Sequence, residues 1–399
     1  MNFKSLLIRG VIIFIICPAL LGISVIVYGM PWPIEPQNKI HPIGNSFGEY
    51  QDYSEKPHYF HTGVDIRVND PKGPNILCSV KGTISKIHLD PTPHYTYVWM
   101  KGSDGRDYWY VHIDPNEIPT SVKDAEGTDT IIKVGEKLGK VAEWPKSSGS
   151  FHHLHFQIRD DKGYINPLRE LNPNNDSGKP EIVNIYICQN NSDKYIHKPI
   201  TGDWVISGDV DIIAEIKDTF QPGGDNIGIY KVEYSIDEVG GSHDISPIVL
   251  WQFDRLPNDI YPNNPETLKV YKDDKTCDSN SEYWGTERYY YIVTNKFEGK
   301  LDEVNGFWDT DGLDKDGNRK FPPGYYDVTV TAYDLSGNSA SKTDRVFVGP
   351  LYVDVVLVID RSGSMWGSKI VSAKNSAKMF VDLMQVNDCL LYTSPSPRD

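Results

Sequence analysis

Cysteine is scarce in this chain, and none of its five cysteines forms a C-x-x-C pair. The spacing excludes a thiolate zinc knuckle and a dithiol redox motif. Cys188 and Cys277 could pair in an oxidising compartment, although we favour free, buried thiols at both positions.

Basic residues are also few: 40 Lys and Arg stand against 55 Asp and Glu, for a net charge of −15. No basic stripe with interleaved aromatic residues is present, so nucleic acid is not an expected partner. Long stretches of helical periodicity are few as well, whereas prolines number 27 and glycines 33. This balance predicts a mainly β protein rich in turns, and 399 residues suit two or three domains.

Only the N-terminus carries an apolar run of membrane-spanning length. Lys4 and Arg9 precede an uncharged stretch at residues 11–28, which is long enough to cross a bilayer. The positive charges should stay cytoplasmic, which predicts a membrane anchor within residues 1–34 and an extracytoplasmic location for the rest. A cleaved signal peptide is the alternative, and both interpretations export the protein.

Residues 35–172 carry nine of the eleven histidines and form the first predicted β domain. Tyr95 to Met100 and Tyr108 to Ile113 flank Ser103-Asp104-Gly105, which is typical of a hairpin. Phe151 to Arg159 alternates between apolar and polar residues. We therefore expect an antiparallel sheet.

A polar linker at 173–180 leads to a second β unit at 181–350. Its clearest element is the alternating stretch that follows Pro322-Pro323-Gly324 and ends in a turn at 334–339. This pattern resembles the terminal hairpin of immunoglobulin-like β-sandwiches in bacterial surface proteins, a resemblance of fold only.

The third segment, residues 351–388, opens with an apolar run that ends at Asp360, as a buried parallel strand does. Asp360-x-Ser362-x-Ser364 after such a strand resembles the start of a von Willebrand factor type A domain. In that family these three residues supply part of a Mg²⁺ site that binds a protein ligand. Here the segment is an incomplete α/β, Rossmann-like fragment, too short to close a core. The final stretch, 389–399, resembles a translated sequencing adapter, and we exclude it from the predicted fold.

The chemistry concentrates in a split histidine–carboxylate set. His61-x-Gly63-x-Asp65 and His153-Leu154-His155 lie some ninety residues apart, with Tyr110-x-His112 between them. The two-residue period of a strand places His61 with Asp65, and His153 with His155, on shared faces. By the same rule, we expect Tyr108, Tyr110 and His112 to share a face opposite Trp109 and Val111. Three nitrogen or oxygen ligands with one open position suit a catalytic zinc ion.

These motifs, with Val134-Gly135-x-x-Leu138-Gly139 between His112 and His153, occur in the order seen in lysostaphin-like (LytM-type) zinc metalloendopeptidases. The resemblance spans about residues 38–170. It implies Zn²⁺ bound by His61, Asp65 and His155, with His112 and His153 as catalytic histidines. It also implies hydrolysis of peptide bonds in peptidoglycan cross-links by zinc-activated water. One departure is His152, where the family often has proline. The alternative is a non-catalytic surface adhesion or scaffold protein that uses the peptidase-like and type A domains for binding.

Overall fold

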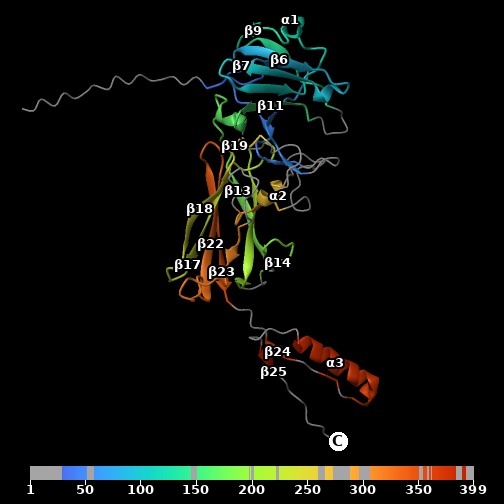
Figure 1. Ribbon diagram of the computed structural model, residues 1–399, viewed down its shortest axis with the longest axis vertical. Coiled ribbons are helices and arrows are strands. Elements are labelled where there is room, and N and C mark those ends of the chain that lie inside the picture. The colour runs from blue at the N-terminus through green and yellow to red at the C-terminus, as the bar shows by residue number, and fades with distance from the viewer. Residues whose placement is uncertain are drawn as a thin grey trace, which may run out of the picture.

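The computed structural model of the protein contains two β-rich units and a short α/β segment (Figure 1). It describes residues 29–51, 58–144, 151–196, 198, 202–221, 224–258, 266–272, 288–295, 306–349, 354–356, 359–360, 362–382 and 389–391. Within these residues, no helix is both long and apolar enough to cross a membrane. The predicted anchor at residues 11–28 lies outside the described residues, as does Cys277, whereas Cys188 is a free, buried thiol.

The first unit is built on a twisted, antiparallel sheet, which is nine-stranded in the described part of the chain. Its main path runs β1-β4-β11-β8-β7-β6-β9. The strands are β1 (Ile43–Asn45), β4 (Val64–Arg67), β11 (His153–Asp160), β8 (Asp107–Val111), β7 (Tyr97–Gly102), β6 (Gly82–His88) and β9 (Ile131–Ile132). Smaller elements around it are the pairs β2 (Tyr50–Gln51) with β3 (Tyr59–Phe60) and β5 (Asn75–Leu77) with β10 (Lys137–Lys140), and the helix α1 (Thr120–Asp124).

Alternation along β11 determines which face of this sheet is buried. Leu154, Phe156 and Ile158 are fully buried in the core, and the residues between them point to the opposite face. The predicted hairpin before β11 is confirmed: β7 and β8 pair antiparallel, and Gly105 takes the positive φ of 85° that the turn requires. The sheet therefore presents one apolar face and one face available for chemistry.

The second unit contains two packed sheets. One has the order β14-β13-β16-β20, with β21 beside β16, and the other has the order β15-β23-β22-β17-β18. The strands are β13 (Glu181–Gln189), β14 (Tyr195–Ile196), β16 (Asp209–Lys217), β20 (Tyr289–Ile292), β21 (Trp308–Asp309), β15 (Trp204–Ile206), β17 (Lys231–Glu238), β18 (Ile245–Gln252), β22 (Gly324–Tyr333) and β23 (Ser339–Val348), with the helix α2 (Thr267–Val270) alongside. The predicted turn-flanked hairpin at 324–348 is thus confirmed as β22 and β23, and β13 contacts both of them across the layers.

The two units share a continuous core instead of meeting only through a linker. Strand β19 (Arg255–Leu256), from the second unit, pairs with β12 (Gly163–Ile165) at the edge of the first unit's sheet. The rings of Phe60 and Phe253 meet edge-on across this junction at 5.7 Å. In the predicted linker, the Pro173 carbonyl accepts a hydrogen bond from Trp32 Nε1 at 2.6 Å. The two units are therefore packed against each other at this junction. The exact limits of the predicted domains stay a prediction.

The third segment contains the strand β24 (Asp354–Val356) and the helix α3 (Ser368–Asp382). The helix lies where the sequence predicts it. The strand β25 (Cys389–Leu391) pairs parallel with β24, and the separate origin of residues 389–399 stays a prediction. An apolar run after a helix has formed the second strand of a β-α-β unit.

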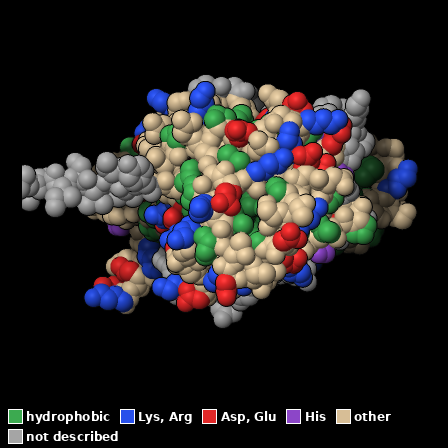
Figure 2. All heavy atoms as spheres, turned by 90° about the horizontal axis from the view of Figure 1, so that it is seen from above, with side chains coloured by type: hydrophobic (Ala, Val, Ile, Leu, Met, Phe, Trp, Pro, Cys, Tyr) green, Lys and Arg blue, Asp and Glu red, His purple; other side chains and the backbone are tan. Residues whose placement is uncertain are grey.

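Charges of both signs are mixed on the surface seen from above the first unit. Figure 2 shows Lys and Arg side chains interspersed with Asp and Glu on this face. In this view, the described residues form no broad region of a single sign. This face therefore carries no field of a single sign.

Candidate metal centre

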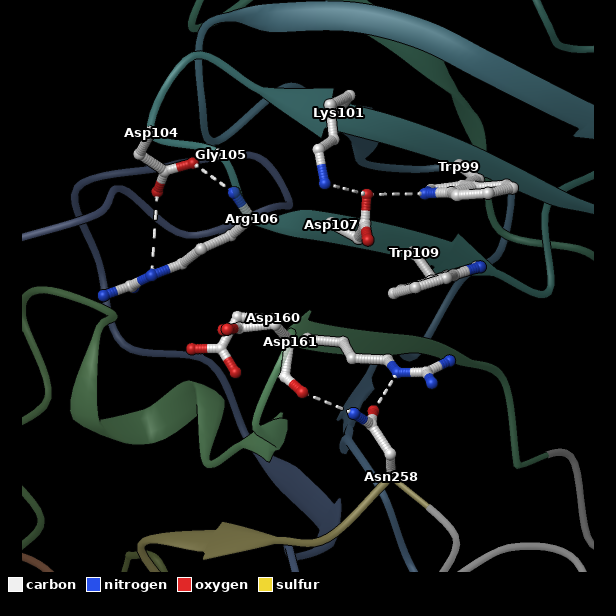
Figure 3. Close-up of a pocket in the computed structure, with 11 residues that line it drawn as sticks. Trp99, Lys101, Asp104, Gly105, Arg106, Asp107, Trp109, Asp160, Asp161 and Asn258 are labelled. Atoms are coloured by element: carbon white, nitrogen blue, oxygen red, sulfur yellow. Dashed lines mark hydrogen bonds and ion pairs between the residues drawn. The ribbon is translucent and has the colours of Figure 1, made fainter.

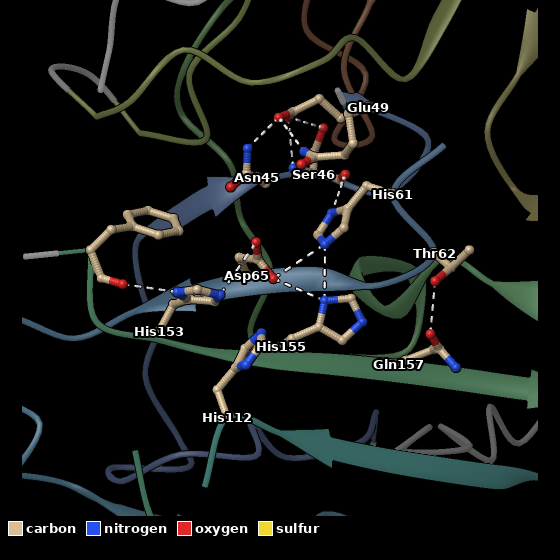
Figure 4. Close-up of polar contacts among 12 residues, drawn as sticks. Asn45, Ser46, Glu49, His61, Thr62, Asp65, His112, His153, His155 and Gln157 are labelled. Atoms are coloured by element: carbon tan, nitrogen blue, oxygen red, sulfur yellow. Dashed lines mark hydrogen bonds and ion pairs between the residues drawn. The ribbon is translucent and has the colours of Figure 1, made fainter. Parts of the chain in front are cut away.

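Three side chains converge at the edge of β4 and β11 (Figure 4). His61 directly follows β3 and lies in the short loop before β4, Asp65 lies on β4, and His155 lies opposite Asp65 in the antiparallel register. Asp65 Oδ1 is 3.2 Å from His61 Nε2 and 3.0 Å from His155 Nδ1. One ligand atom from each residue lies within 4.8 Å of the others. The structure therefore brings together all three residues that the sequence nominates as metal ligands.

Backbone contacts fix how the His61 ring presents itself. Its Nδ1–H donates to the Ser46 carbonyl at 2.9 Å, which leaves the Nε2 lone pair facing Asp65. A hydrogen bond of this kind selects the tautomer and orients a metal-binding histidine. Gly63 lies against the His155 ring, and a Cβ there would sit 2.7 Å from His155 Nε2. The glycine of the His-x-Gly-x-Asp motif is thus needed for space.

The electrostatics of the cluster favour an anionic carboxylate. Burial alone would raise the pKa of Asp65, but the charges of His61 and His153 and the hydrogen bonds from the neighbouring histidines outweigh burial and hold that pKa well below its usual range. Burial would lower the pKa of His61, but the negative charge of Asp65 outweighs the effect of burial. The pKa of His61 is therefore raised. Asp65 is therefore a carboxylate at neutral pH, which suits a divalent cation.

The two predicted catalytic histidines stand beside this cluster. His153 Nε2 is 3.7 Å from Asp65 Oδ2, and the rings of His153 and His112 are 4.5 Å apart. The Nδ1–H of His153 donates to the Phe151 carbonyl, and that of His112 donates to the His94 carbonyl. Burial lowers the pKa of both rings. The charges of His153 and His155 lower the pKa of His112 further. For His153, burial outweighs the charge of Asp65, which acts to raise the pKa. Both are neutral at pH 7, with Nε2 free to accept a proton.

Our prediction that Tyr108, Tyr110 and His112 share one face of the sheet is wrong. Tyr108 and Tyr110 are fully buried in the core, on the face opposite the metal cluster. Val111 pairs with His155 in the register, so the odd-numbered residues of β8 lie on the cluster's face. His112 reaches the site because it follows the end of β8 with a φ of 69°, a left-handed conformation that breaks the alternation.

A cavity of about 660 Å³ lies over the cluster, and its aromatic walls were missed by sequence reasoning. Tyr97 and Trp109 line one side, and Trp144 lies 5.0 Å from the rings of both His112 and His153. His152, a conceivable competing ligand, instead accepts a hydrogen bond from the Trp144 backbone N–H at 2.9 Å. It therefore anchors the wall of the cavity.

A second residue that sequence reasoning missed is Glu49, which is fully buried behind His61. Its carboxylate accepts hydrogen bonds from Asn45 Nδ2 at 2.5 Å, Ser46 N at 2.8 Å and Gly228 N at 3.0 Å. Ser46 is the residue whose carbonyl holds the His61 ring. The only sequence signal was a carboxylate placed among apolar neighbours, between Phe47 and Tyr50.

The structure also brings together the residues of the predicted magnesium site. Ser362 Oγ is 3.1 Å from Asp360 Oδ2 and 2.8 Å from Ser364 Oγ. The three side chains are exposed and hydrogen-bond to one another. Octahedral Mg²⁺ requires six oxygen ligands, so Mg²⁺ binding here stays a prediction.

Comparison with known proteins places the site within a family. A model of Peptidase family M23 matches residues 59–167, the part of the chain that carries the three clustered residues and both flanking histidines. These residues therefore form a peptidase M23 domain, as the lysostaphin-like motifs predict. The match does not extend to the second β unit or to the third segment.

Stage II sporulation protein Q from Bacillus subtilis (strain 168) is 28% identical over 106 residues, which are 27% of this chain and 34% of that protein. The chain thus matches about a third of that relative's length. Among solved structures, the SpoIIQ–SpoIIIAH pore-forming complex aligns at 23% identity and a TM-score of 0.28, covering 36% of this chain and 90% of that one. The catalytic domain of lysostaphin from Staphylococcus simulans aligns at 18% identity and a TM-score of 0.25, covering 32% and 90% respectively.

Proposed function

We propose that this chain, whose residues 59–167 form a peptidase M23 domain, is an exported zinc metalloendopeptidase that hydrolyses peptide bonds in peptidoglycan cross-links. One observation carries the proposal: His61, Asp65 and His155 converge with their ligand atoms within 4.8 Å. Members of the M23 family are zinc-dependent and act on peptidoglycan. The apolar run at residues 11–28 supports export, with the enzyme anchored at the outer side of the membrane.

The donor set fits zinc. Two imidazole nitrogens and one carboxylate oxygen are borderline and hard donors of the kind that Zn²⁺ takes in hydrolytic sites. Protein contacts position both histidines, since the Ser46 carbonyl orients His61 and Gly63 leaves space for the ring of His155. A zinc ion held there would polarise the scissile carbonyl and make a water molecule acidic at neutral pH.

Proton transfer falls to His112 and His153. Each ring donates Nδ1–H to a backbone carbonyl, so each keeps a basic Nε2 on its other side. Because both pKa values are lowered by burial, the rings are neutral and able to take a proton from water. Once protonated, an imidazolium can give that proton to the leaving amine or stabilise negative charge on the carbonyl oxygen.

The cavity over the cluster suits an extended peptide. It is open to solvent and lined by Tyr97, Trp109 and Trp144, with Thr62 and Gln157 hydrogen-bonded to each other at 2.8 Å on its floor. The aromatic walls give contact area, and polar groups on the same lining, such as Gln51 and Arg159, can hydrogen-bond to a peptide backbone. A cross-link peptide would be held there with its scissile bond near His153.

The remaining units would position the enzyme. We assign the packed sheets of residues 181–350 to an immunoglobulin-like sandwich, and residues 351–388 to the start of a type A domain with a protein ligand at its Mg²⁺ site. The boundaries at 35–172, 173–180 and 181–350 belong to this proposal too. The hairpin of β22 and β23 supports the sandwich, and the order of β24 and α3 supports the type A start.

Digestion of purified peptidoglycan tests the proposal. We expect new amino termini and soluble peptides to appear with the wild-type protein, and not after metal chelation or in a His112→Asn variant. Zinc added after chelation should restore cleavage. Binding to the wall without any new amino terminus would instead indicate a non-catalytic adhesion or scaffold protein.

A further inference from the structure

The face of the sheet that holds the metal cluster continues past it as an aromatic strip. In the register, His155 of β11 lies beside Val111 and Tyr97. Two residues along each strand, Gln157 lies beside Trp109, and Trp109 lies beside Trp99. Since residues two apart on a strand share a face, the two tryptophans lie on the same side of the sheet as His155.

This strip forms one wall of a second pocket, of about 650 Å³ (Figure 3). The rings of Trp99 and Trp109 are parallel to within 11°, with centroids 5.4 Å apart, and both are only partly buried. Trp99 Nε1 donates to Asp107 Oδ1 at 3.2 Å, which holds its ring in place. Trp109 lines this pocket and the cavity over the metal cluster alike, so the two hollows adjoin.

The polar wall of the pocket is dense but nearly neutral. It carries three cationic and four anionic side chains, namely Lys101, Arg106 and Arg159 against Asp104, Asp107, Asp160 and Asp161. Several are already paired, such as Lys101 with Asp107 at 3.1 Å. Because the charges balance, the pocket attracts neither polyanions nor polycations. It offers planar hydrogen-bonding groups to an uncharged, polar ligand.

The second unit closes the far side. Asn258 Nδ2 donates to the Asp161 carbonyl at 2.8 Å, and Asn258 Oδ1 accepts from Arg159 Nε. A cross-strand tryptophan pair can serve simply to stabilise a hairpin. Here it borders a hollow with amide, guanidinium and carboxylate groups on the opposite wall, so aromatic rings and hydrogen-bonding groups line the same space.

We infer that the pocket beside Trp99 and Trp109 binds a neutral, N-acetylated oligosaccharide. The apolar faces of pyranose rings pack on indole faces, and hydroxyl and acetamido groups hydrogen-bond to carboxylate, amide and guanidinium groups. The choice of saccharide rests on the proposed function, because cross-link peptides are attached to a glycan of N-acetylated hexosamines. The glycan would occupy this pocket while its peptide reaches the metal cluster through the adjoining cavity.

Titration with chitotetraose, a glycan without peptide, tests this inference. We expect saturable binding to the full chain by calorimetry, an affinity at least about tenfold weaker for Trp99→Ala, and an intermediate loss for Trp99→Phe. The matched control is Trp366→Ala, since Trp366 is 84% exposed and lies in the third segment; its affinity should equal that of the wild type. If Trp99→Ala does not fold, by circular dichroism, Trp99→Phe decides the question.

Two results would overturn the inference: no binding of chitotetraose by the wild type at millimolar concentration, or equal affinities for the wild type and the Trp99 variants. A His155→Ala variant separates this inference from the proposed function. It should lose zinc and still bind chitotetraose as the wild type does. Loss of saccharide binding in His155→Ala would show that the pocket is not the independent site described here.

Discussion

The carboxylate of Glu49 accepts a hydrogen bond from the backbone N–H of Gly228 at 3.0 Å, across the junction between the two β units. The same carboxylate binds the backbone N–H of Ser46, and the Ser46 carbonyl holds the Nδ1–H of His61. Ser46 Oγ donates in turn to the Gly228 carbonyl at 3.1 Å. The second unit is therefore part of the support of the metal cluster, because its backbone fixes the loop that orients His61.

Replacing Glu49 by alanine should destabilise the whole protein. The change leaves buried donors of Asn45, Ser46 and Gly228 without their acceptor, and each costs about 1–3 kcal/mol. We expect thermal unfolding at a clearly lower temperature, with both units lost in one transition. The control is Glu181→Ala, whose side chain is 61% exposed and should cost no more than about 0.5 kcal/mol. Equal unfolding temperatures for the two variants would contradict the conclusion that Glu49 stabilises the junction between the two units.

A Gly63→Ala variant should weaken zinc binding although it replaces none of the three metal ligands. Its Cβ would lie 2.6 Å from the Phe156 carbonyl oxygen and 2.7 Å from His155 Nε2, so the ring of His155 has to move. Changes that misplace a ligand typically cost about 10–100-fold in metal affinity. Competition with a chromogenic chelator measures this loss. Gly363→Ala is the matched control, since no atom lies within 4 Å of a Cβ there, and identical zinc affinities for both variants would refute the steric account.

His112→Asn should remove catalysis and preserve the metal site. Asparagine tolerates the left-handed φ of 69° found at this position, so the backbone should keep its course while the imidazole is lost. We expect kcat to fall about 10²–10⁴-fold, the usual contribution of a general base, with zinc content unchanged. His112→Ala should lose the same activity and about 1–2 kcal/mol of stability as well. Cleavage by His112→Asn at the wild-type rate would exclude His112 from the chemistry.

Stability should depend on pH through Asp218, a buried carboxylate at the junction. Burial, with the charge of Asp334, raises the pKa of Asp218 to about 7, and burial raises that of the adjacent Asp176 to about 8. The folded protein thus prefers the neutral acid. The resulting stabilisation is complete below the unfolded pKa of about 3.9 and is lost as pH rises through about 7.

Asp218→Asn imitates the neutral acid at every pH. Its melting temperature should match the wild type near pH 4 and exceed it by several degrees at pH 8. Melting curves across this range make the comparison, with Asp237→Asn as a control at an exposed position. A difference between wild type and Asp218→Asn that does not grow with pH would contradict the assignment.

The metal cluster could be predicted from sequence because it depends on local patterns. The two-residue period of strands holds for His153 and His155 on β11, and β11 pairs with β4 so that His155 lies opposite Asp65. His61 lies in the short loop before β4, where the Ser46 carbonyl orients its ring. The position of His112 could not be predicted the same way, since a single left-handed residue ends the alternation of β8. The hydrogen bonds of Glu49 could not be predicted either, because Gly228 lies 179 residues away in the chain. Long-range backbone donors leave no periodic signature.

Zinc content of the purified protein tests the central claim most directly. After dialysis against metal-free buffer, elemental analysis should find about one zinc per wild-type chain, as expected for a three-ligand hydrolytic site. The His155→Ala variant, folded by circular dichroism, should hold almost none. A wild-type protein without stoichiometric zinc, or a His155→Ala variant that retains as much as the wild type, would contradict the assignment of His61, Asp65 and His155 as a zinc site.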